Sequence, residues 1–168
     1  SSTIVPSGIP VHRPMGQTLP NGQSTPVFGP SQAIDFELET AFITTDANIM
    51  GENITVNETE DYIFGMVLLN DWSARDMQKW EYVPLGPFLA KNFASSISPW
   101  IVTMDALEPF RTKGPKQEPT PLPYLQQKGK HAYDINLEVY IKPENVEETL
   151  VSKSNFKYMY WSMSQQLA

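Results

Sequence analysis

The sequence predicts a mainly β domain with few short helices, an α+β arrangement closer to a folded sheet or barrel than to a parallel α/β sheet. Three observations favour this class. Residues 34–39 and 133–141 alternate apolar and polar side chains at the period of a strand. Residues 1–32 are rich in Pro, Gly and Ser, which suits short extended pieces joined by turns. Neither an internal repeat nor a phosphate-binding glycine loop interrupts this pattern.

The first alternating segment predicts a strand with one acidic face. Over 34–39 the apolar side chains are Ile34, Phe36 and Leu38, and the acidic ones are Asp35, Glu37 and Glu39. We expect this strand to continue to Thr45 and to be followed by a turn around Gly51.

The remaining elements follow from runs of apolar residues and from proline. The apolar run 63–69 is short enough to be a buried strand or a buried helix. Residues 97–104 predict a strand, and 133–141 predict another with one solvated face. Five prolines make 107–124 a loop or extended crossing. An apolar stripe over 154–168 predicts a helix without a glycine cap, and we expect it to belong to a longer polypeptide.

Composition excludes several classes of protein. The chain has 168 residues, is 40% hydrophobic, carries a net charge of −7 and has no cysteine. Nucleic acid and anionic membranes usually attract basic partners, so neither is an expected ligand. Without cysteine there is no disulfide, thiolate zinc site or thiol nucleophile. No apolar run reaches the roughly 20 residues of a membrane span, and a cytoplasmic protein is expected.

The segment 70–82 is the richest in chemical groups. As a helix it would align Asp71, Arg75, Gln78 and Tyr82, at offsets of four, three and four, on one face. This stripe offers one possible metal ligand and three hydrogen-bond donors. An ordinary salt-bridged helix surface is the alternative, against which stands the high density of aromatic residues in and after the segment.

Glu37 and Glu39 lie about 6–7 Å apart on one face of the predicted strand. A solvated strand face is the simpler interpretation and the one that this segment alone favours. A cation held between the two carboxylates is the sharper one, and oxygen ligands suit Mg²⁺ or Ca²⁺. Asp71 is a plausible third ligand. His12 and His131, the two histidines, have no supporting catalytic motif, and surface or structural roles are expected for both.

The same residues resemble the fumarylacetoacetase (fumarylacetoacetate hydrolase) family. The specific match is the block 70–88, followed by Lys91, Phe93 and Ile97-Ser98-Pro99-Trp100. Shorter matches in the same order occur at 13–17, 35–39, Tyr124, 134–137, 154–157 and 165–167, so the resemblance covers essentially the whole chain.

This resemblance implies a mixed β-sandwich/β-roll fold, incomplete at both ends. Residues 1–168 would be a single partial domain, the central part of the family's C-terminal catalytic domain. The implied activity is metal-dependent hydrolysis of a carbon–carbon bond in the 1,3-diketo acid fumarylacetoacetate, which gives fumarate and acetoacetate at the end of tyrosine and phenylalanine catabolism. The implied partners are this small molecule and a second copy of the chain, in a homodimer.

The resemblance also implies roles for individual residues. Glu37, Glu39 and Asp71 would be three of four carboxylate ligands of a catalytic Ca²⁺ or Mg²⁺. Arg75, Gln78 and Lys91 would stabilise the oxyanion, and Tyr82 with Gln78 would contact the substrate. Lys91 and Ser95 match positions near a second, structural Mg²⁺, where the family more often has Thr in place of Ser95.

The family's water-activating His and its partner Glu have no match in this chain. We expect the His and the fourth metal ligand before Ser1 and the Glu after Ala168, so the isolated chain should be inactive. Two alternatives stay open. One is an acylpyruvate-type hydrolase of the same superfamily, and the other is a metal-binding structural module without catalysis.

Overall fold

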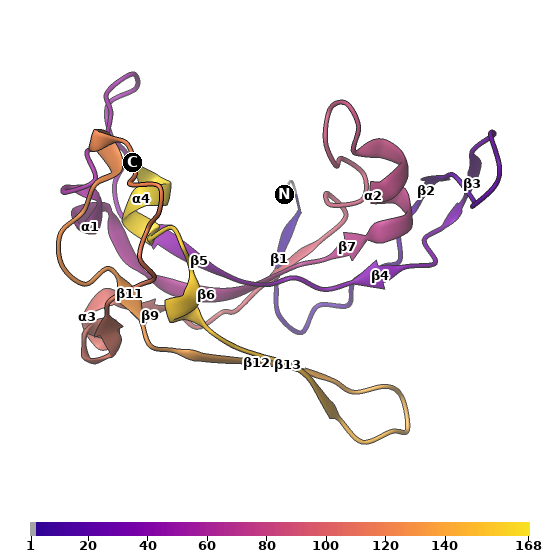
Figure 1. The fold of residues 1–168 in the computed structure, drawn as a ribbon. Helices are drawn as coiled ribbons and strands as arrows, with labels where there is room; N and C mark the ends of the chain where they lie inside the picture. The colour runs from indigo at the N-terminus through magenta and orange to yellow at the C-terminus, as the bar shows by residue number, and fades with distance from the viewer. Residues whose placement is uncertain (1–2) are drawn as a thin grey trace. The chain divides into compact units, whose positions relative to one another are not determined.

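A computed structural model describes residues 3–168, and short strands make up most of its regular structure (Figure 1). The strands are β1 Ile4–Pro6, β2 Met15–Thr18, β3 Val27–Pro30, β4 Ile34–Asp35, β5 Leu38–Thr44, β6 Ile63–Asp71, β7 Ser73–Ala74, β8 Ser95–Ile97, β9 Val102–Thr103, β10 Arg111–Thr112, β11 Ala132–Tyr133, β12 Asn136–Ile141 and β13 Thr149–Asn155. The helices are α1 Thr59–Tyr62, α2 Arg75–Glu81, α3 Met104–Leu107, α4 Met163–Leu167 and the 3₁₀ turns η1 Glu108–Phe110, η2 Pro123–Leu125 and η3 Phe156–Tyr158. The prediction of a mainly β domain with few short helices is confirmed.

The chain forms two compact units. Unit 1 contains the described residues through Ala41 together with Val67–Ile101, and unit 2 contains Phe42–Met66 together with Val102–Ala168. Strands β5 and β6 contribute residues to both units. The prediction of one partial domain over 1–168 stays a prediction. Within the described residues, no helix is long and apolar enough to cross a membrane.

Four strand pairings organise unit 1. Strand β8 pairs in parallel with β1 and antiparallel with β6, where Asp71 faces Ser95 across the ladder. Strand β4 pairs antiparallel with β7, and β2 pairs antiparallel with β3. These ladders fix the chain on both sides of the segment 70–82, from which half of the predicted site residues come.

Helix α2 covers a small apolar cluster in unit 1. Ala74, Met77 and Ala90 are buried, with Ile34 and Phe93 packed against them. Met77 is 1% exposed and also lies against Gly16 of β2, where a Cβ atom would come within 2.8 Å of the Met77 sulfur. Packing of Met77, in the first turn of α2, against this cluster and against Gly16 therefore positions the helix.

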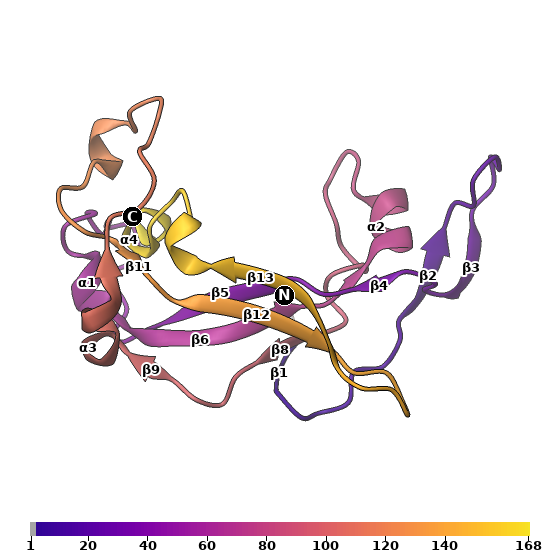
Figure 2. The same ribbon diagram turned by 60° about the horizontal axis from the view of Figure 1, so that its bottom comes forward.

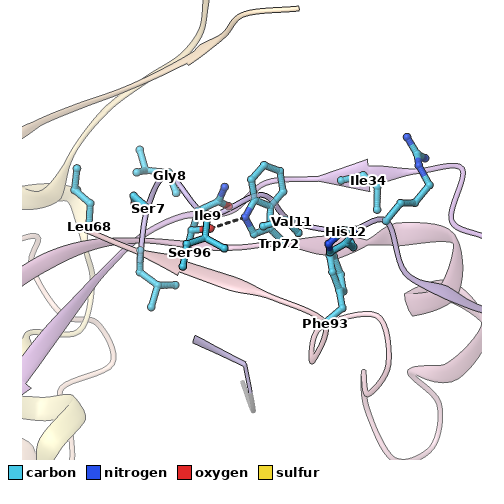
Figure 3. Close-up of a pocket in the computed structure, with 14 residues that line it drawn as sticks. Ser7, Gly8, Ile9, Val11, His12, Ile34, Leu68, Trp72, Phe93 and Ser96 are labelled. Atoms are coloured by element: carbon cyan, nitrogen blue, oxygen red, sulfur yellow. Dashed lines mark hydrogen bonds between the residues drawn. The ribbon is translucent and has the colours of Figure 1, made fainter. Parts of the chain in front are cut away.

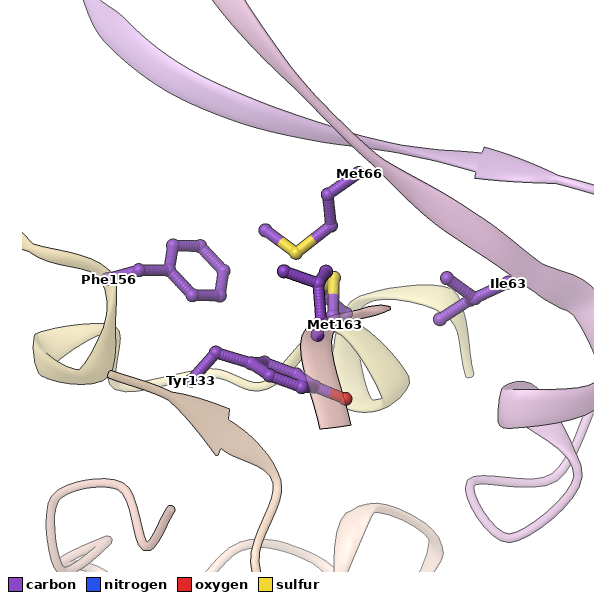
Figure 4. Packing of buried hydrophobic residues seen from close by; sticks show 6 residues of the cluster. Ile63, Met66, Tyr133, Phe156 and Met163 are labelled. Carbon is purple, nitrogen blue, oxygen red and sulfur yellow. The ribbon is translucent and has the colours of Figure 1, made fainter. Parts of the chain in front are cut away.

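Unit 2 has a larger apolar core, shown in Figure 4. Its buried members come from β6, the α3 helix, β11, η3 and α4, and they are Ile63, Met66, Leu107, Tyr133, Phe156 and Met163. Strands β12 and β13 pair antiparallel in a long hairpin (Figure 2), which confirms the alternating pattern over 133–141.

Two predicted helices are corrected by the structure, and one open choice is decided. The helix over 70–82 was too long, because β6 runs to Asp71, β7 occupies 73–74 and α2 begins only at Arg75. The open choice at 63–69 resolves as strand β6. The helix over 154–168 was also wrong, since Asn155 ends β13 and α4 begins after the capping box of Ser162 with Gln165.

The strand predicted over 97–104 is interrupted. Strand β8 ends at Ile97, β9 covers only 102–103 and α3 starts at Met104, where the Thr103 side chain accepts from the Ala106 N–H. The irregular stretch 107–124 agrees with its proline content, since it holds two 3₁₀ turns and the two-residue strand β10.

Candidate metal and oxyanion site

Three carboxylates from two segments of unit 1 converge. Glu37 lies between β4 and β5, Glu39 lies in β5, and Asp71 is the last residue of β6. One oxygen from each lies within 4.8 Å of the others. The backbone fixes this arrangement, because the Asp71 N–H donates to the Glu37 carbonyl at 3.2 Å and the Glu37 N–H donates to Asn70 Oδ1 at 3.1 Å. The convergence hypothesised from the sequence is present.

Lys91 and Ser95 hold two of these carboxylates. The Lys91 ammonium lies 2.7 Å from Glu37 Oε2 and donates to Asp71 Oδ2 at 3.1 Å. The Ser95 hydroxyl, which is fully buried, donates to the other Asp71 oxygen at 3.0 Å. Asp71 is therefore bound at both oxygens by residues that the sequence places 20 and 24 positions later.

Arg75 organises the opposite side of Glu37. Its Nε donates to Asp35 Oδ2 and its Nη1 donates to Glu37 Oε1, both at 2.8 Å. Nη1 also donates to Gln78 Oε1 at 2.9 Å, which leaves the Gln78 amide NH₂ as a donor. Within residues 3–168 no hydrogen bond uses Arg75 Nη2. Arg75 Nη2 and the Gln78 amide NH₂, both from the first turn of α2, thus remain as donors beside the carboxylates.

The carboxylates differ in how readily they ionise. A hydrogen bond from Lys91 lowers the pKa of Glu37, despite partial burial, and Arg75 lowers it further. A hydrogen bond from Arg75 likewise lowers the pKa of Asp35. For Glu39 the direction is opposite, because burial and the charges of Asp71 and Glu37 raise its pKa. Lys91 and Arg75 bind Glu37, and Lys91 also binds Asp71. Burial and the charges of Asp71 and Glu37 instead disfavour the ionised form of Glu39.

This donor set fits a hard divalent cation. All the candidate ligands are oxygen atoms, which Mg²⁺ and Ca²⁺ prefer. Burial and the negative charges of Asp71 and Glu37 raise the pKa of Glu39 more than the charge of Lys91 lowers it, and a bound divalent cation would relieve this repulsion between the carboxylates. Since Glu37, Glu39 and Asp71 already lie within reach of one point, they would hold the cation, with Ser95 and Lys91 supporting Asp71.

The other predicted residues lie outside this cluster. Tyr82 is the C-cap of α2 and about half exposed, so its phenol is accessible from solvent. His131 belongs to unit 2, where Nε2 contacts the Lys128 carbonyl at 2.8 Å. His12 lines a different part of unit 1, described next.

Figure 3 shows a pocket of about 560 Å³ in unit 1 that contains His12. Its walls are mostly apolar and include Leu68, Trp72 and Phe93. The Trp72 indole N–H donates to Ser96 Oγ at 2.9 Å. None of the residues that line the pocket is acidic, so this surface differs in chemistry from the carboxylate cluster.

Sequence reasoning missed three acidic residues that shape the site. Asp35 binds Arg75, Asp76 binds the segment before β4, and Glu81 binds the segment before Lys91. Asp35 shares the alternating acidic face with Glu37, and this signal could have identified it. Nothing comparable marks Asp76 or Glu81, because their partners are backbone N–H groups and a serine from distant segments.

Comparisons with known proteins identify the family of the chain. The family model described as fumarylacetoacetate (FAA) hydrolase C-terminal matches residues 1–168. Curated fumarylacetoacetases are similar over the whole chain: 57% identical in Dictyostelium discoideum, 56% in Oryza sativa subsp. japonica and 54% in Homo sapiens. The matches cover 99–100% of this chain and 39–40% of each relative, so the chain spans about 40% of their length.

A solved structure shows the same fold at low sequence identity. Cg1458 matches with a TM-score of 0.52 and 15% identity, over 90% of this chain and 55% of that chain. Together with the full-length family match and more than 50% identity to the curated relatives, the conclusion is direct. This chain belongs to the fumarylacetoacetate hydrolase family.

Proposed function

We propose that the protein hydrolyses fumarylacetoacetate to fumarate and acetoacetate. The bond that breaks joins the fumaryl carbonyl carbon to the methylene carbon that separates the two carbonyl groups. The observation that carries this proposal is that three carboxylates converge and that Lys91 and Arg75 bind two of them, with Gln78 bound to Arg75. The names of the curated relatives support the same reaction.

The reaction adds water across one bond. The water gives a proton to a general base, its oxygen bonds to the fumaryl carbonyl carbon, and the oxygen of that carbonyl becomes an oxyanion. The carbon–carbon bond then breaks, the electron pair leaves with the acetoacetate carbon as an enolate, and a proton completes the product. Negative charge therefore develops on two oxygens in succession, and donors aimed at those oxygens lower the barrier.

The residues of this chain suit that charge. Arg75 Nη2 and the Gln78 amide NH₂ can donate to the oxyanion, while the other donors of Arg75 stay fixed on Asp35 and Glu37. The Lys91 ammonium adds a formal positive charge. A divalent cation held by Glu37, Glu39 and Asp71 would act as a Lewis acid toward the diketone oxygens.

Water activation is proposed to come from outside residues 1–168. A general base must reach the attacking water through a hydrogen bond. His131 Nε2 contacts the Lys128 carbonyl, and His12 lines the apolar pocket rather than the carboxylate cluster. The isolated chain is therefore expected to bind the cation without turnover.

Glu37→Gln in the full-length protein tests the metal site. Removing one carboxylate charge should weaken Ca²⁺ or Mg²⁺ binding by about tenfold or more and reduce hydrolysis in proportion. Calorimetry gives the affinity, and loss of fumarylacetoacetate absorbance gives the rate. Glu147→Gln, an exposed carboxylate in the β12–β13 turn, is the matched control. Equal affinity of Glu37→Gln and the control would remove Glu37 from the ligands.

The same assay separates the two enzyme classes. A fumarylacetoacetase should prefer fumarylacetoacetate over a simple acylpyruvate, and Gln78→Ala should change that preference. An acylpyruvate-type hydrolase would show the reverse order. Cation binding without turnover of either substrate would favour a metal-binding structural module.

A homodimer and a cytoplasmic location complete the proposal. The family resemblance of the block 70–88 motivates the homodimer, and the cytoplasmic location is carried over from the expectation drawn from the sequence. Sedimentation of the full-length protein distinguishes a dimer from a monomer, and imaging of a tagged protein in its own cell gives the compartment.

A further inference from the structure

We propose that Glu81 is the positioning residue for Lys91. Its carboxylate would hold the backbone just before Lys91 in the one conformation that delivers the ammonium to Glu37 and Asp71. This inference rests on the proposed function for the importance of Lys91, but the contacts that carry it are independent of any substrate.

The Glu81 carboxylate accepts hydrogen bonds from three consecutive backbone N–H groups. Oε1 accepts from Phe88 and from Ala90, both at 2.7 Å, and Oε2 accepts from Leu89 at 3.1 Å. Bonds from amides to a carboxylate are charge-assisted and stronger than neutral ones. Both oxygens are in use, so the side chain has one orientation.

The geometry of the turn explains why an anion is needed there. The N–H groups of Lys91 and Asn92 both donate to the Phe88 carbonyl, at 3.1 Å each, as in a single helical turn. The first N–H groups of such a turn have no partner within it and point their positive ends the same way. Glu81, from the last turn of α2, supplies the negative charge that this end of the turn attracts.

The residue before Lys91 is fixed from both sides. Ala90 is fully buried against Ala74 and Met77, its N–H donates to Glu81, and its carbonyl accepts from the Ala74 N–H at 3.0 Å. Lys91 starts from this anchored point and reaches Glu37 at 2.7 Å and Asp71 at 3.1 Å. Its side chain is only 16% exposed, so a displaced backbone would leave few other routes for the ammonium.

The contrast within the loop supports the assignment. The exposed loop 82–89 holds Leu85, which is 92% exposed, and Gly86 in the left-handed region with φ of +91°. Without Glu81, the N–H groups of the three residues between this exposed loop and Lys91 would lose their hydrogen bonds to the carboxylate. The carboxylate therefore binds the exposed end of this loop, at Phe88 and Leu89, together with the buried Ala90 that precedes Lys91.

Glu81→Gln in the full-length protein is the primary test. The amide keeps one oxygen for Phe88 and Ala90 but turns an NH₂ toward the Leu89 N–H, so two donors face each other. We expect kcat to fall about 10–100-fold with KM changed much less, because a displacement of about 1 Å at a reacting group has effects of this size. Glu81→Asp keeps the charge, and we expect it to restore part of the loss.

A double-mutant cycle shows whether Glu81 acts through Lys91. In a Lys91→Met background, Glu81→Gln should cost less than about twofold, because the group that it positions is gone. Equal losses in both backgrounds would overturn the proposal and leave Glu81 with a general structural role. Glu147→Gln again serves as the surface control, with unchanged kinetics.

Chemical labelling separates this proposal from the proposed function. Reductive methylation, read by peptide mass spectrometry, should modify Lys91 about tenfold faster in Glu81→Gln than in wild type, with other lysines unchanged. If the wild-type protein does not hydrolyse fumarylacetoacetate, the function fails while the labelling still tests the positioning. Unchanged labelling of Lys91 in both Glu81 variants would overturn it.

Discussion

Single side chains hold distant segments of unit 1 together, and Asp76 is the clearest example. One oxygen accepts from the Ser31 hydroxyl at 2.6 Å, and the other accepts from the Gln32 N–H at 2.7 Å. Ser31 is completely buried, and its carbonyl accepts from Arg13. Asp76 therefore fixes the chain just before β4, which leads to Asp35 and the metal carboxylates.

Asp76→Asn should destabilise the protein in a pH-dependent way. Burial raises the Asp76 pKa, but the hydrogen bonds from Ser31, Gln32 and Met77 outweigh it, so the folded-state pKa lies below the unfolded value of about 3.9. The stability that this charge contributes is thus complete above pH ~5 and is lost as pH falls through the folded pKa. We expect a loss of about 1–3 kcal/mol at pH 7.

Denaturant unfolding of wild type and Asp76→Asn between pH 7 and pH 3.5 measures this effect. The difference in unfolding free energy should shrink toward the acid end, since the carboxyl of the unfolded chain has the higher pKa and takes up a proton there before the folded one does. A difference that stays constant over the whole range would show that the charge of Asp76 does not contribute.

Residue-scale interactions also explain which site residues sequence reasoning could find. Glu37, Glu39 and Asp71 are acidic residues at the edges of apolar segments, and that pattern is visible in the sequence. Asp76 and Glu81 read as ordinary solvated helix charges because each binds backbone groups whose positions depend on the folded loops. Hydrogen bonds to distant backbone leave no trace in residue type or spacing.

At the scale of elements, α2 is positioned by close packing against β2. A Cβ on Gly16 would lie 2.8 Å from the sulfur and 3.1 Å from the terminal methyl of Met77, which is 1% exposed. Its cross-strand partner Gly29, on β3, has no atom within 4 Å of the corresponding position. The two paired glycines thus have opposite surroundings.

Gly16→Ala should therefore lower stability by about 1–3 kcal/mol, the usual cost of overpacking a buried contact. Gly29→Ala, the matched control, should change stability by less than about 0.5 kcal/mol. Thermal or denaturant unfolding of both variants makes the comparison. Equal effects would mean that Met77 moves aside freely and that the packing does not constrain α2.

Element boundaries mark the limit of sequence reasoning. The alternation over 133–141 predicted β12 because one face of that hairpin is partly buried. The helical spacing over 70–82 assigned Asp71 to a helix, although its backbone pairs with Ser95 in β8. Strand pairing across 24 residues is a long-range property, and local helical spacing cannot reveal it.

At the scale of the whole molecule, the candidate site and the main core belong to different units. Every carboxylate and donor of the site lies in unit 1, whereas the largest apolar cluster lies in unit 2. Stability and cation affinity can therefore be altered separately.

Phe156→Leu tests this separation. Phe156 is 7% exposed in the unit 2 core, and its truncation should lower the free energy of unfolding by about 1–3 kcal/mol. Calcium affinity from calorimetry should stay within about twofold of wild type. Glu37→Gln should do the reverse, with weaker cation binding and a smaller change in stability. A large loss of affinity in Phe156→Leu would show that the two units are energetically coupled.

The division of unit 1 into two chain segments has a consequence for its synthesis. Arg75 follows its partner Asp35 by 40 residues, and a ribosome that adds about 5–20 residues per second needs roughly 2–8 s to make that stretch. During this interval the acidic strand exists without its arginine, and the unit 2 segment Phe42–Met66 is made before Arg75. The nascent polypeptide must therefore keep two carboxylates solvated until the second segment arrives to complete the site.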